Sequence, residues 1–439
     1  MTVLVAPYVA EARRVAAARR AGEPEWVTRA RCEGLEQFQE LGFPTSRDED
    51  WRFTSVAPIA AGGFRAAANG ASSFDPRRLE PFEWPGELAA SLVFVNGRHA
   101  PGASTIGRLP PGVRVESLAQ ALATRPDGVG ARLTRLAAAG RTAFTALNTA
   151  FLGDGAFVFV PDSTLVAAPI HLVFVSVGEG TRTMAHPRVL AVMGAGSQAS
   201  IVESYVAVDA ERYFTNAVTE ATVGENARLN HYKIQRESAT SFHVGALYVR
   251  AARNANVACH SVALGGSLVR NDVHVVLDGE GATGTLNGLY LGDGARLVDN
   301  HTTLDHARPH CGSREVYKGI LAGQARGVFN GKVIVRPGAQ KTDARQTNKA
   351  LLLSEEAQIN TKPQLEIFAD DVKCTHGAAV GQVDEEAIFY LRARGLSEPQ
   401  ARHLLIRGFA GDVLNQMPLE ALRARIDQDL ALWLSGGPA

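Results

Sequence analysis

Short apolar runs bounded by turn residues dominate the middle of this chain. From about Asp154 onward such runs are separated by Gly, Asn, Asp and Pro, and the helical spacing of apolar residues disappears until about residue 380. Representative runs lie at 157–160, 170–175, 189–192 and 273–277. This pattern predicts a core built from β-strands.

A weak internal repeat runs through the β-rich region. A turn is followed by Ala, a polar residue and an apolar residue at 199–201, 227–229, 255–257, 295–297 and 357–359, and the first three copies lie 28 residues apart. A small residue at a recurring corner, followed by one residue facing out and one facing in, is typical of a sheet coiled into stacked turns. We therefore expect a β-solenoid. A β-sandwich would use the same strands but join neighbours by hairpins.

Helical spacing precedes the β-rich region. The apolar positions Cys32, Leu35, Phe38 and Leu41 recur every three or four residues, which places them on one face of a helix that ends at residues 42–45. On this pattern Cys32 is interpreted as a small core residue. The first part of the chain is therefore expected to be a mainly helical domain.

Helical signals return after Gly381. Asp384 is placed to cap a helix at 385–391, and residues 397–400 form a capping-box pattern that opens a second helix. The apolar stripe of a third helix consists of Leu419, Leu422, Ile426, Leu430 and Trp433. We expect three domains: a mainly helical N-terminal domain at 1–153, a β-solenoid at 154–380 and a helical C-terminal domain at 381–439.

Composition and charge narrow the possible functions. The 45 Lys and Arg residues balance the 45 Asp and Glu residues, so no bulk field favours nucleic acid or an anionic membrane. The N-terminus lacks the basic segment of a signal peptide, and no apolar stretch approaches the roughly 20 residues of a membrane span. A cytoplasmic protein is expected.

The four cysteines, Cys32, Cys259, Cys311 and Cys374, are widely scattered and form no Cys-x-x-Cys pair. This spacing favours reduced thiols over a disulfide framework or a four-cysteine metal site within one chain. We interpret Cys259 as a core residue, with the adjacent His260 facing the other way along a strand.

Two glycine-rich motifs resemble nucleotide-binding loops only superficially. Residues 279–284 satisfy the GxGxxG pattern but are followed by a strand-like segment rather than by a helix, so we expect a solenoid turn. Residues 327–333 have the wrong glycine spacing for a phosphate loop, and Val333 stands where Ser or Thr would bind magnesium. The chain is therefore not expected to be an ATPase.

Potential metal ligands gather at two places. The segment 301–311 contains three histidines and Cys311, but its spacing matches no common zinc pattern, so a structural or interface role is favoured there. At Cys374 and His376 the two-residue separation puts a thiol and an imidazole on the same face of an extended strand. Two ligands cannot complete a site. Either the pair is inert or a partner chain supplies the remaining ligands.

The sequence around this pair resembles the SufB/SufD family of the SUF iron–sulphur cluster assembly machinery, and its SufD members in particular. The most specific agreement lies at 331–333, 346–349, 351–354, 362–367, 371–378 and 384–386, with weaker agreement at 44–54, 309–314 and 317–319. The resemblance covers most of the chain.

This resemblance implies a right-handed parallel β-helix between two helical domains. It also implies a non-catalytic scaffold that pairs with a SufB-like subunit through the β-helix and holds the SufC ATPase through its C-terminal domain; a homodimer in isolation stays open. A transient iron–sulphur cluster would form at the SufB interface, with His376 as this chain's contribution and Cys374 as a less certain one. No permanent cofactor is expected within the chain.

Three alternatives remain open on the sequence. The chain could be a SufB-type paralogue, although its length and the segment 374–378 favour the SufD type. It could be a partner-binding β-helix in which Cys374 and His376 are inert. A β-helix polysaccharide lyase or hydrolase would need clustered carboxylates, which are not evident.

Overall fold

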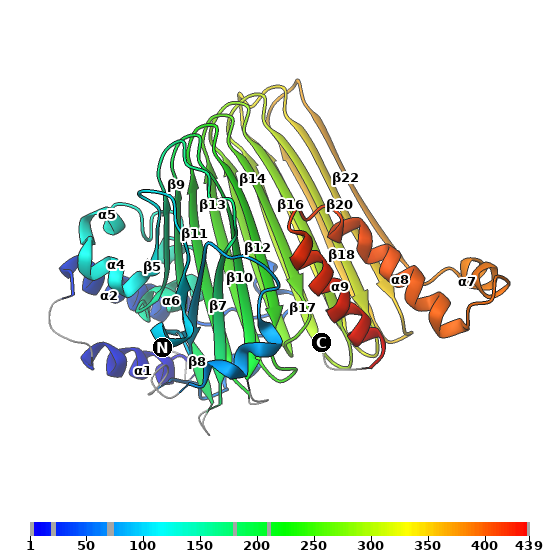
Figure 1. Ribbon diagram of the computed structural model, residues 1–439, viewed down its shortest axis with the longest axis horizontal. Coiled ribbons are helices and arrows are strands. Elements are labelled where there is room, and N and C mark those ends of the chain that lie inside the picture. The colour runs from blue at the N-terminus through cyan, green and yellow to red at the C-terminus, as the bar shows by residue number, and fades with distance from the viewer. Residues whose placement is uncertain (1–3, 19–22, 68–73, 179–181, 209–211, 437–439) are drawn as a thin grey trace.

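The computed structural model describes residues 4–18, 23–67, 74–178, 182–208 and 212–436, and its dominant feature is a parallel β-solenoid (Figure 1). The strands that precede the regular coil are β1 (Arg65–Ala66), β2 (Ala90–Val95), β3 (Arg98–His99), β4 (Thr105–Ile106), β5 (Arg114–Ser117), β6 (Gly155–Val160), β7 (Ile170–Val177), β8 (Thr183–Ala185) and β9 (Arg188–Met193). The strands of the regular coil are β10 (Gln198–Val208), β11 (Phe214–Val223), β12 (Arg228–Arg236), β13 (Phe242–Ala251), β14 (Asn256–Ala263), β15 (Leu268–Leu277), β16 (Thr283–Gly292), β17 (Leu297–His306), β18 (Gly312–Leu321), β19 (Arg326–Val335), β20 (Asp343–Leu352), β21 (Gln358–Ile367) and β22 (Lys373–Gly381).

Successive strands alternate between two sheets. One sheet runs in the order β21-β19-β17-β15-β13-β11-β9-β6-β5, and the other in the order β22-β20-β18-β16-β14-β12-β10-β7-β2-β3. From β10 onward every pairing is parallel, as between β18 and β20 or between β19 and β21. Parallel pairing of every second strand is the connectivity of a solenoid and excludes the hairpin-linked sandwich. The predicted fold class is confirmed.

The corner predicted from the repeat is a continuous column of small buried residues. A backbone hydrogen bond links each corner to the following turn. The first N–H of each even-numbered strand from β12 onward donates to the carbonyl of the corner residue one turn earlier, as Asn256 does to Ala227. The corner residues are Ser197, Ala227, Ala255, Ala282, Cys311 and Thr342. None of them is more than 1 % exposed. Cys311 therefore takes the place of an alanine in the corner column.

Two predicted copies of the repeat are wrong. Ala199 lies inside β10, where it is in register with Leu229 rather than with the corner residue Ala227. Ala295 is exposed because it belongs to the turn at Asp293 and Gly294, which protrudes before β17. The glycine-rich segment 279–282 is a turn before β16, as expected, and Gly327 and Gly331 lie within β19.

Helices flank the solenoid at both ends of the chain (Figure 1). The α-helices are α1 (Ala6–Ala17), α2 (Glu25–Leu41), α3 (Ala57–Ala60), α4 (Leu118–Thr124), α5 (Pro126–Gly130), α6 (Ala143–Ala150), α7 (Glu385–Arg392), α8 (Glu398–Leu414) and α9 (Glu420–Leu434). The 3-10 helices are η1 (Glu49–Trp51), η2 (Pro76–Phe82), η3 (Pro101–Ala103) and η4 (Ala139–Arg141). Within the described ranges, no helix is both long and apolar enough to cross a lipid bilayer.

The helix predicted around Phe38 is present as α2, but its buried face matches the predicted one only in part: Phe38 is buried and Leu35 is half-buried, whereas Leu41 is exposed. Cys32 is exposed, whereas Gly34 and Phe38 are buried. A Cβ on Gly34 would lie 2.8 Å from the backbone nitrogen of Ala150, so the glycine allows α2 to pack closely on α6. The interpretation of Cys32 as a core residue is wrong because this close approach selects the face of α2 that carries Gly34.

The C-terminal helices α8 and α9 lie against the outer face of the even-numbered sheet (Figure 1). Asp384 Oδ1 accepts a hydrogen bond from the backbone of Glu386 at the start of α7, and Ser397 forms the predicted capping box at the start of α8. Four of the five residues in the predicted α9 stripe are buried, namely Leu422, Ile426, Leu430 and Trp433. They pack with apolar outward-facing residues of the sheet, including Tyr232 and Ile234 of β12.

Two polar contacts fix this docking. Lys318 of β18 donates through Nζ to the carbonyl of Phe409 at 2.8 Å and to Asp412 Oδ2 at 2.5 Å. Arg236 of β12 donates to Asp429 Oδ2 at 3.3 Å. The helical domain therefore covers a side of the solenoid, while α7 projects past the last strand, β22 (Figure 1).

Candidate functional site

The solenoid ends in two open sheet edges, β21 and β22. β21 pairs with β19 and β22 pairs with β20, and in the described part of the chain neither pairs with a further strand. Figure 1 shows this open end on the opposite side of the solenoid from the N-terminal helices. Free edges present rows of unpaired N–H and C=O groups, which are a template for pairing with another sheet.

Cys374 and His376 lie on this last strand and share one face of it. Cys374 is opposite Ala344 of β20, and His376 is opposite Gln346. Because Cys374 packs against the interior core cluster and side chains two residues apart share a face, both positions belong to the inward face of β22. The structure therefore brings the two predicted site residues together at the open end.

The two side chains differ in accessibility. Cys374 is half-buried, and burial raises the pKa of its thiol. A raised pKa disfavours the thiolate, which is the form that binds metal. His376 is exposed. The imidazole is thus the more accessible of the two donors.

The predicted ligand-rich segment 301–311 does not converge on one point. His301 faces outward on β17, where its Nε2 lies 3.1 Å from Asp299 Oδ1. His306 is buried inside, and its Nε2 is hydrogen-bonded to Ser313 Oγ at 2.9 Å. Cys311 is the corner residue, with Sγ 3.3 Å from the carbonyl of Gly279. The third histidine, His310, is exposed in the turn before β18. These side chains point to different places, so they do not form one metal site together.

A chain of polar residues continues inward from His376. Gln346 of β20 lies opposite His376 of β22 in the strand register, and Glu315 of β18 lies opposite Gln346 on the other side. Gln346 Nε2 donates to Glu315 Oε2 at 2.7 Å, and both side chains are buried. Burial raises the pKa of Glu315 to about 7.

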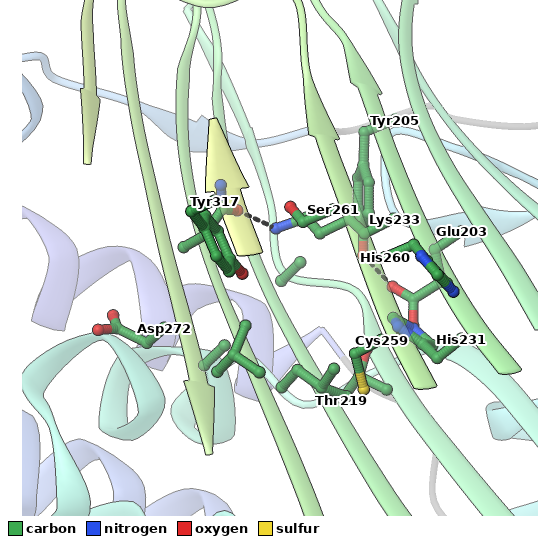
Figure 2. Close-up of a pocket in the computed structure, with 16 residues that line it drawn as sticks. Glu203, Tyr205, Thr219, His231, Lys233, Cys259, His260, Ser261, Asp272 and Tyr317 are labelled. Atoms are coloured by element: carbon green, nitrogen blue, oxygen red, sulfur yellow. Dashed lines mark hydrogen bonds and ion pairs between the residues drawn. The ribbon is translucent and has the colours of Figure 1, made fainter. Parts of the chain in front are cut away.

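A second polar cluster lies deeper in the solenoid, around a cavity of about 30 Å³ (Figure 2). Glu203 accepts hydrogen bonds from Tyr205 Oη at 2.6 Å, Thr219 Oγ1 at 2.7 Å and His231 Nε2 at 2.8 Å. Burial opposes ionisation of Glu203, but His231 and the other donors outweigh it, so its pKa is lowered. A cavity of this size has room for ordered water rather than for a larger ligand.

Lys233 and Cys259 also face this cavity (Figure 2). Lys233 Nζ donates to Asn271 Oδ1 at 2.6 Å, and burial lowers the pKa of the lysine to about 8. Burial raises the pKa of Cys259 to about 12, so the predicted core position of this thiol is confirmed. His260 faces the opposite way and stacks on Tyr232.

Sequence reasoning missed this internal cluster. The signal in the sequence was a pair of polar residues, His231 and Lys233, that alternate with the apolar residues of the same strand. No group of three or more His, Cys, Asp or Glu side chains in the described residues is arranged to hold a metal ion. Any metal site at Cys374 and His376 therefore requires ligands from elsewhere.

Comparison with known proteins gives the class to which this solenoid belongs. Residues 174–409 match the family model described as "SUF system FeS cluster assembly, SufBD core domain", and residues 9–172 match the "SufBD protein N-terminal region". The chain belongs to the SufBD family of the SUF system for iron–sulphur cluster assembly.

Individual relatives extend over nearly the whole chain. An iron–sulphur cluster assembly SufBD family protein of Synechocystis is 37 % identical over 396 residues, covering 88 % of this chain and 87 % of the relative. The iron–sulphur cluster assembly protein SufD of Escherichia coli is 32 % identical over 406 residues, covering 92 % of each chain. SufD of Bacillus subtilis is 25 % identical, covering 92 % of this chain and 93 % of the relative.

Proposed function

We propose that the chain is a non-catalytic, SufD-type scaffold subunit whose last turn supplies half of a site for nascent iron–sulphur clusters. The observation that carries this proposal is the position of Cys374 and His376 on the inward face of a strand with a free edge. Two donors beside a row of unpaired backbone groups suit a site completed by a second solenoid, a SufB-like subunit. The cluster is cargo, and an incomplete half-site favours its release.

His376 is proposed as the primary ligand of this half-site. It is exposed, whereas the half-buried thiol of Cys374 has a raised pKa and must lose a proton in order to bind iron. Cys374 would bind the metal only after a partner or the metal itself favours the thiolate form of its side chain.

The C-terminal helices are proposed to bind the SufC ATPase, with α7 as the main contact. Phe389 is 74 % exposed and Tyr390 is 57 % exposed, although both are large and apolar. Adjacent exposed aromatic residues are typical anchors of protein interfaces. Several arginines of this domain form ion pairs within it, as Arg402 does with Glu385 and Arg407 with Asp427, so the aromatic residues are the better candidates.

The test of the half-site is anaerobic co-expression with SufB and SufC, followed by iron and sulphide analysis. His376→Ala is expected to lower cluster content and transfer strongly, and Cys374→Ala is expected to lower them less. Thr375→Ala is the matched control, because Thr375 lies between the two on the same strand and faces the other way. Cluster content and transfer that match wild type in both the His376 and the Cys374 variants would leave only a structural, partner-binding role.

The test of the ATPase surface uses a pair of substitutions rather than removal of the domain. Deleting residues 384–439 would expose the apolar outer face around Tyr232 and Ile234, so lost binding could reflect misfolding. Phe389→Ser with Tyr390→Ser is expected to abolish co-purification with SufC at unchanged thermal stability. Leu432→Ser on α9, where Leu432 is 53 % exposed, is the control. Retained binding in the α7 variant would refute the assignment.

A further inference from the structure

The inward face beneath His376 forms a short polar column that the proposed half-site does not use. In register, His376 stands over Gln346, Gln346 over Glu315, and Glu315 over Leu286. Neighbouring strands of a sheet are about 4.8 Å apart, so each side chain is within reach of the next. Leu286 is apolar and fully buried, and it ends the column.

Gln346 is held in a defined orientation. Its side chain donates from Nε2 to Glu315 Oε2 at 2.7 Å, which commits the donor end of the amide to the turn below. Gly331 on the opposite sheet makes room for the amide, because a Cβ there would lie 2.4 Å from Nε2. Gly331 and Gln346 thus form a matched pair across the interior.

The acceptor end of this amide is unused. Gln346 is 2 % exposed, and its Oε1 has no hydrogen-bond partner among the described residues. A buried acceptor without a partner costs about 1–3 kcal/mol. The nearest ring in the column belongs to His376 of the next turn.

A histidine that binds metal through one ring nitrogen usually donates a hydrogen bond from the other. That hydrogen bond fixes the tautomer and the direction of the ring. Loss of such a partner typically lowers metal affinity by about 10- to 100-fold. His376 has the exposure required of a ligand, and Gln346 has the unused acceptor.

We propose that Gln346 is a positioning residue for His376. Its Oε1 accepts the N–H of one ring nitrogen once a partner covers the open end, so that the other nitrogen presents its lone pair to the metal. Glu315 sets the direction of the Gln346 amide. The role in metal binding rests on the proposed function, whereas the hydrogen bond between Gln346 and His376 requires only that a partner covers the open end.

The neighbouring column provides an internal control. Asn348 is also fully buried on the inward face of β20, and its Oδ1 also lacks a partner among the residues described. It stands opposite Ala378, which has no ring to position. A substitution at Asn348 therefore removes a similar buried amide from the same strand without affecting the proposed contact.

The direct test is the tautomer of His376 in the complete complex. Only this subunit is labelled with ¹⁵N-histidine, the complex is kept free of metal so that no metal fixes the tautomer, and the spectra are recorded with the ring neutral. The His376 signals are assigned by their absence from His376→Gln. Wild type and Asn348→Ala are expected to show one protonated and one unprotonated nitrogen, well separated. Gln346→Met should show the averaged shifts of a tautomer mixture.

A swapped pair provides the rescue. In Glu315→Gln combined with Gln346→Glu, the amide and the carboxylate exchange places, and an acceptor oxygen still faces His376, so the single tautomer should return. If Gln346→Met does not fold, Glu315→Met tests the same point, since it removes the group that orients Gln346 and should also produce a mixture. Averaged shifts in wild type, or no change in either methionine variant, would overturn the inference.

The second measurement separates the inference from the proposed function. Iron retained by the complex is compared for wild type, Gln346→Met and His376→Ala, and an affinity about 10- to 100-fold lower is expected for Gln346→Met. Unchanged iron in His376→Ala would refute the proposed half-site, whatever the spectra show. Reduced iron in His376→Ala but not in Gln346→Met would refute the positioning role alone.

Discussion

Glu315 makes the stability of this protein depend on pH in a direction opposite to that of most carboxyl groups. It is buried inside the solenoid, and burial raises its pKa from 4.5 to about 7. Above 4.5 the unfolded chain releases this proton, while the folded chain keeps it until about pH 7. The folded chain therefore binds more protons in this window, and stability falls as the pH rises through it.

The size of the effect follows from the two pKa values. A difference of one pKa unit corresponds to about 1.4 kcal/mol of unfolding free energy, so the whole shift of Glu315 corresponds to about 3 kcal/mol. Between pH 5 and pH 8 the expected loss is about 2.5 kcal/mol. Glu315→Gln removes the titrating group but keeps an oxygen that can accept from Gln346 Nε2. The variant is thus expected to lack this loss of stability.

The assay is urea unfolding of wild type and Glu315→Gln at pH 5 and pH 8. The difference in unfolding free energy between the two proteins is taken at each pH, so that the contributions of all other titrating groups cancel. Relative to the variant, wild type is expected to lose about 2.5 kcal/mol between the two pH values. An equal difference at pH 5 and pH 8 would show that Glu315 does not hold a proton in the folded core.

Two further predictions concern packing at the N-terminal end. Gly34→Ala should destabilise the chain by about 1–3 kcal/mol in thermal unfolding, because the new Cβ meets the backbone of α6. Cys32→Ala, on the exposed face of the same helix, is the control and should change stability by less than about 0.5 kcal/mol. Arg188→Met should cost about 3–5 kcal/mol in urea unfolding, because Arg188 Nη2 lies 2.7 Å from Glu220 Oε1 and both side chains are fully buried. A smaller loss in the double variant with Glu220→Gln than in Arg188→Met alone would confirm that the unpaired carboxylate is the cause.

The architecture was predictable because the repeat and the strand parity are local properties. A small residue at Ala227 and Ala255 marks the corner directly, and the two-residue spacing of Cys374 and His376 places them on one face wherever the strand lies. The helix caps at Asp384 and Ser397 are equally local. These features need no knowledge of distant contacts.

The internal polar cluster was not predictable, because tertiary contacts reverse the usual alternation. In β12 the inward positions include His231 and Lys233, while Tyr232 and Ile234 face outward. The outward pair is buried because α8, α9 and Trp84 pack over that face. From the pattern of this strand alone, Tyr232 and Ile234 would be placed in the interior, and His231 and Lys233 on the outer face. The exposed Cys32 has a similar cause, since the packing of Gly34 on α6 decides which face of α2 is buried.

If His376 is one half of a shared site, its ring must lie close to a ligand atom of the partner subunit. A structure of the complex with SufB and SufC, determined anaerobically with iron bound, gives this distance. Ligands of one metal lie about 2.0–2.3 Å from it, so we expect a His376 ring nitrogen within about 5 Å of a SufB ligand atom. A separation greater than about 10 Å, with the metal bound elsewhere, would contradict it.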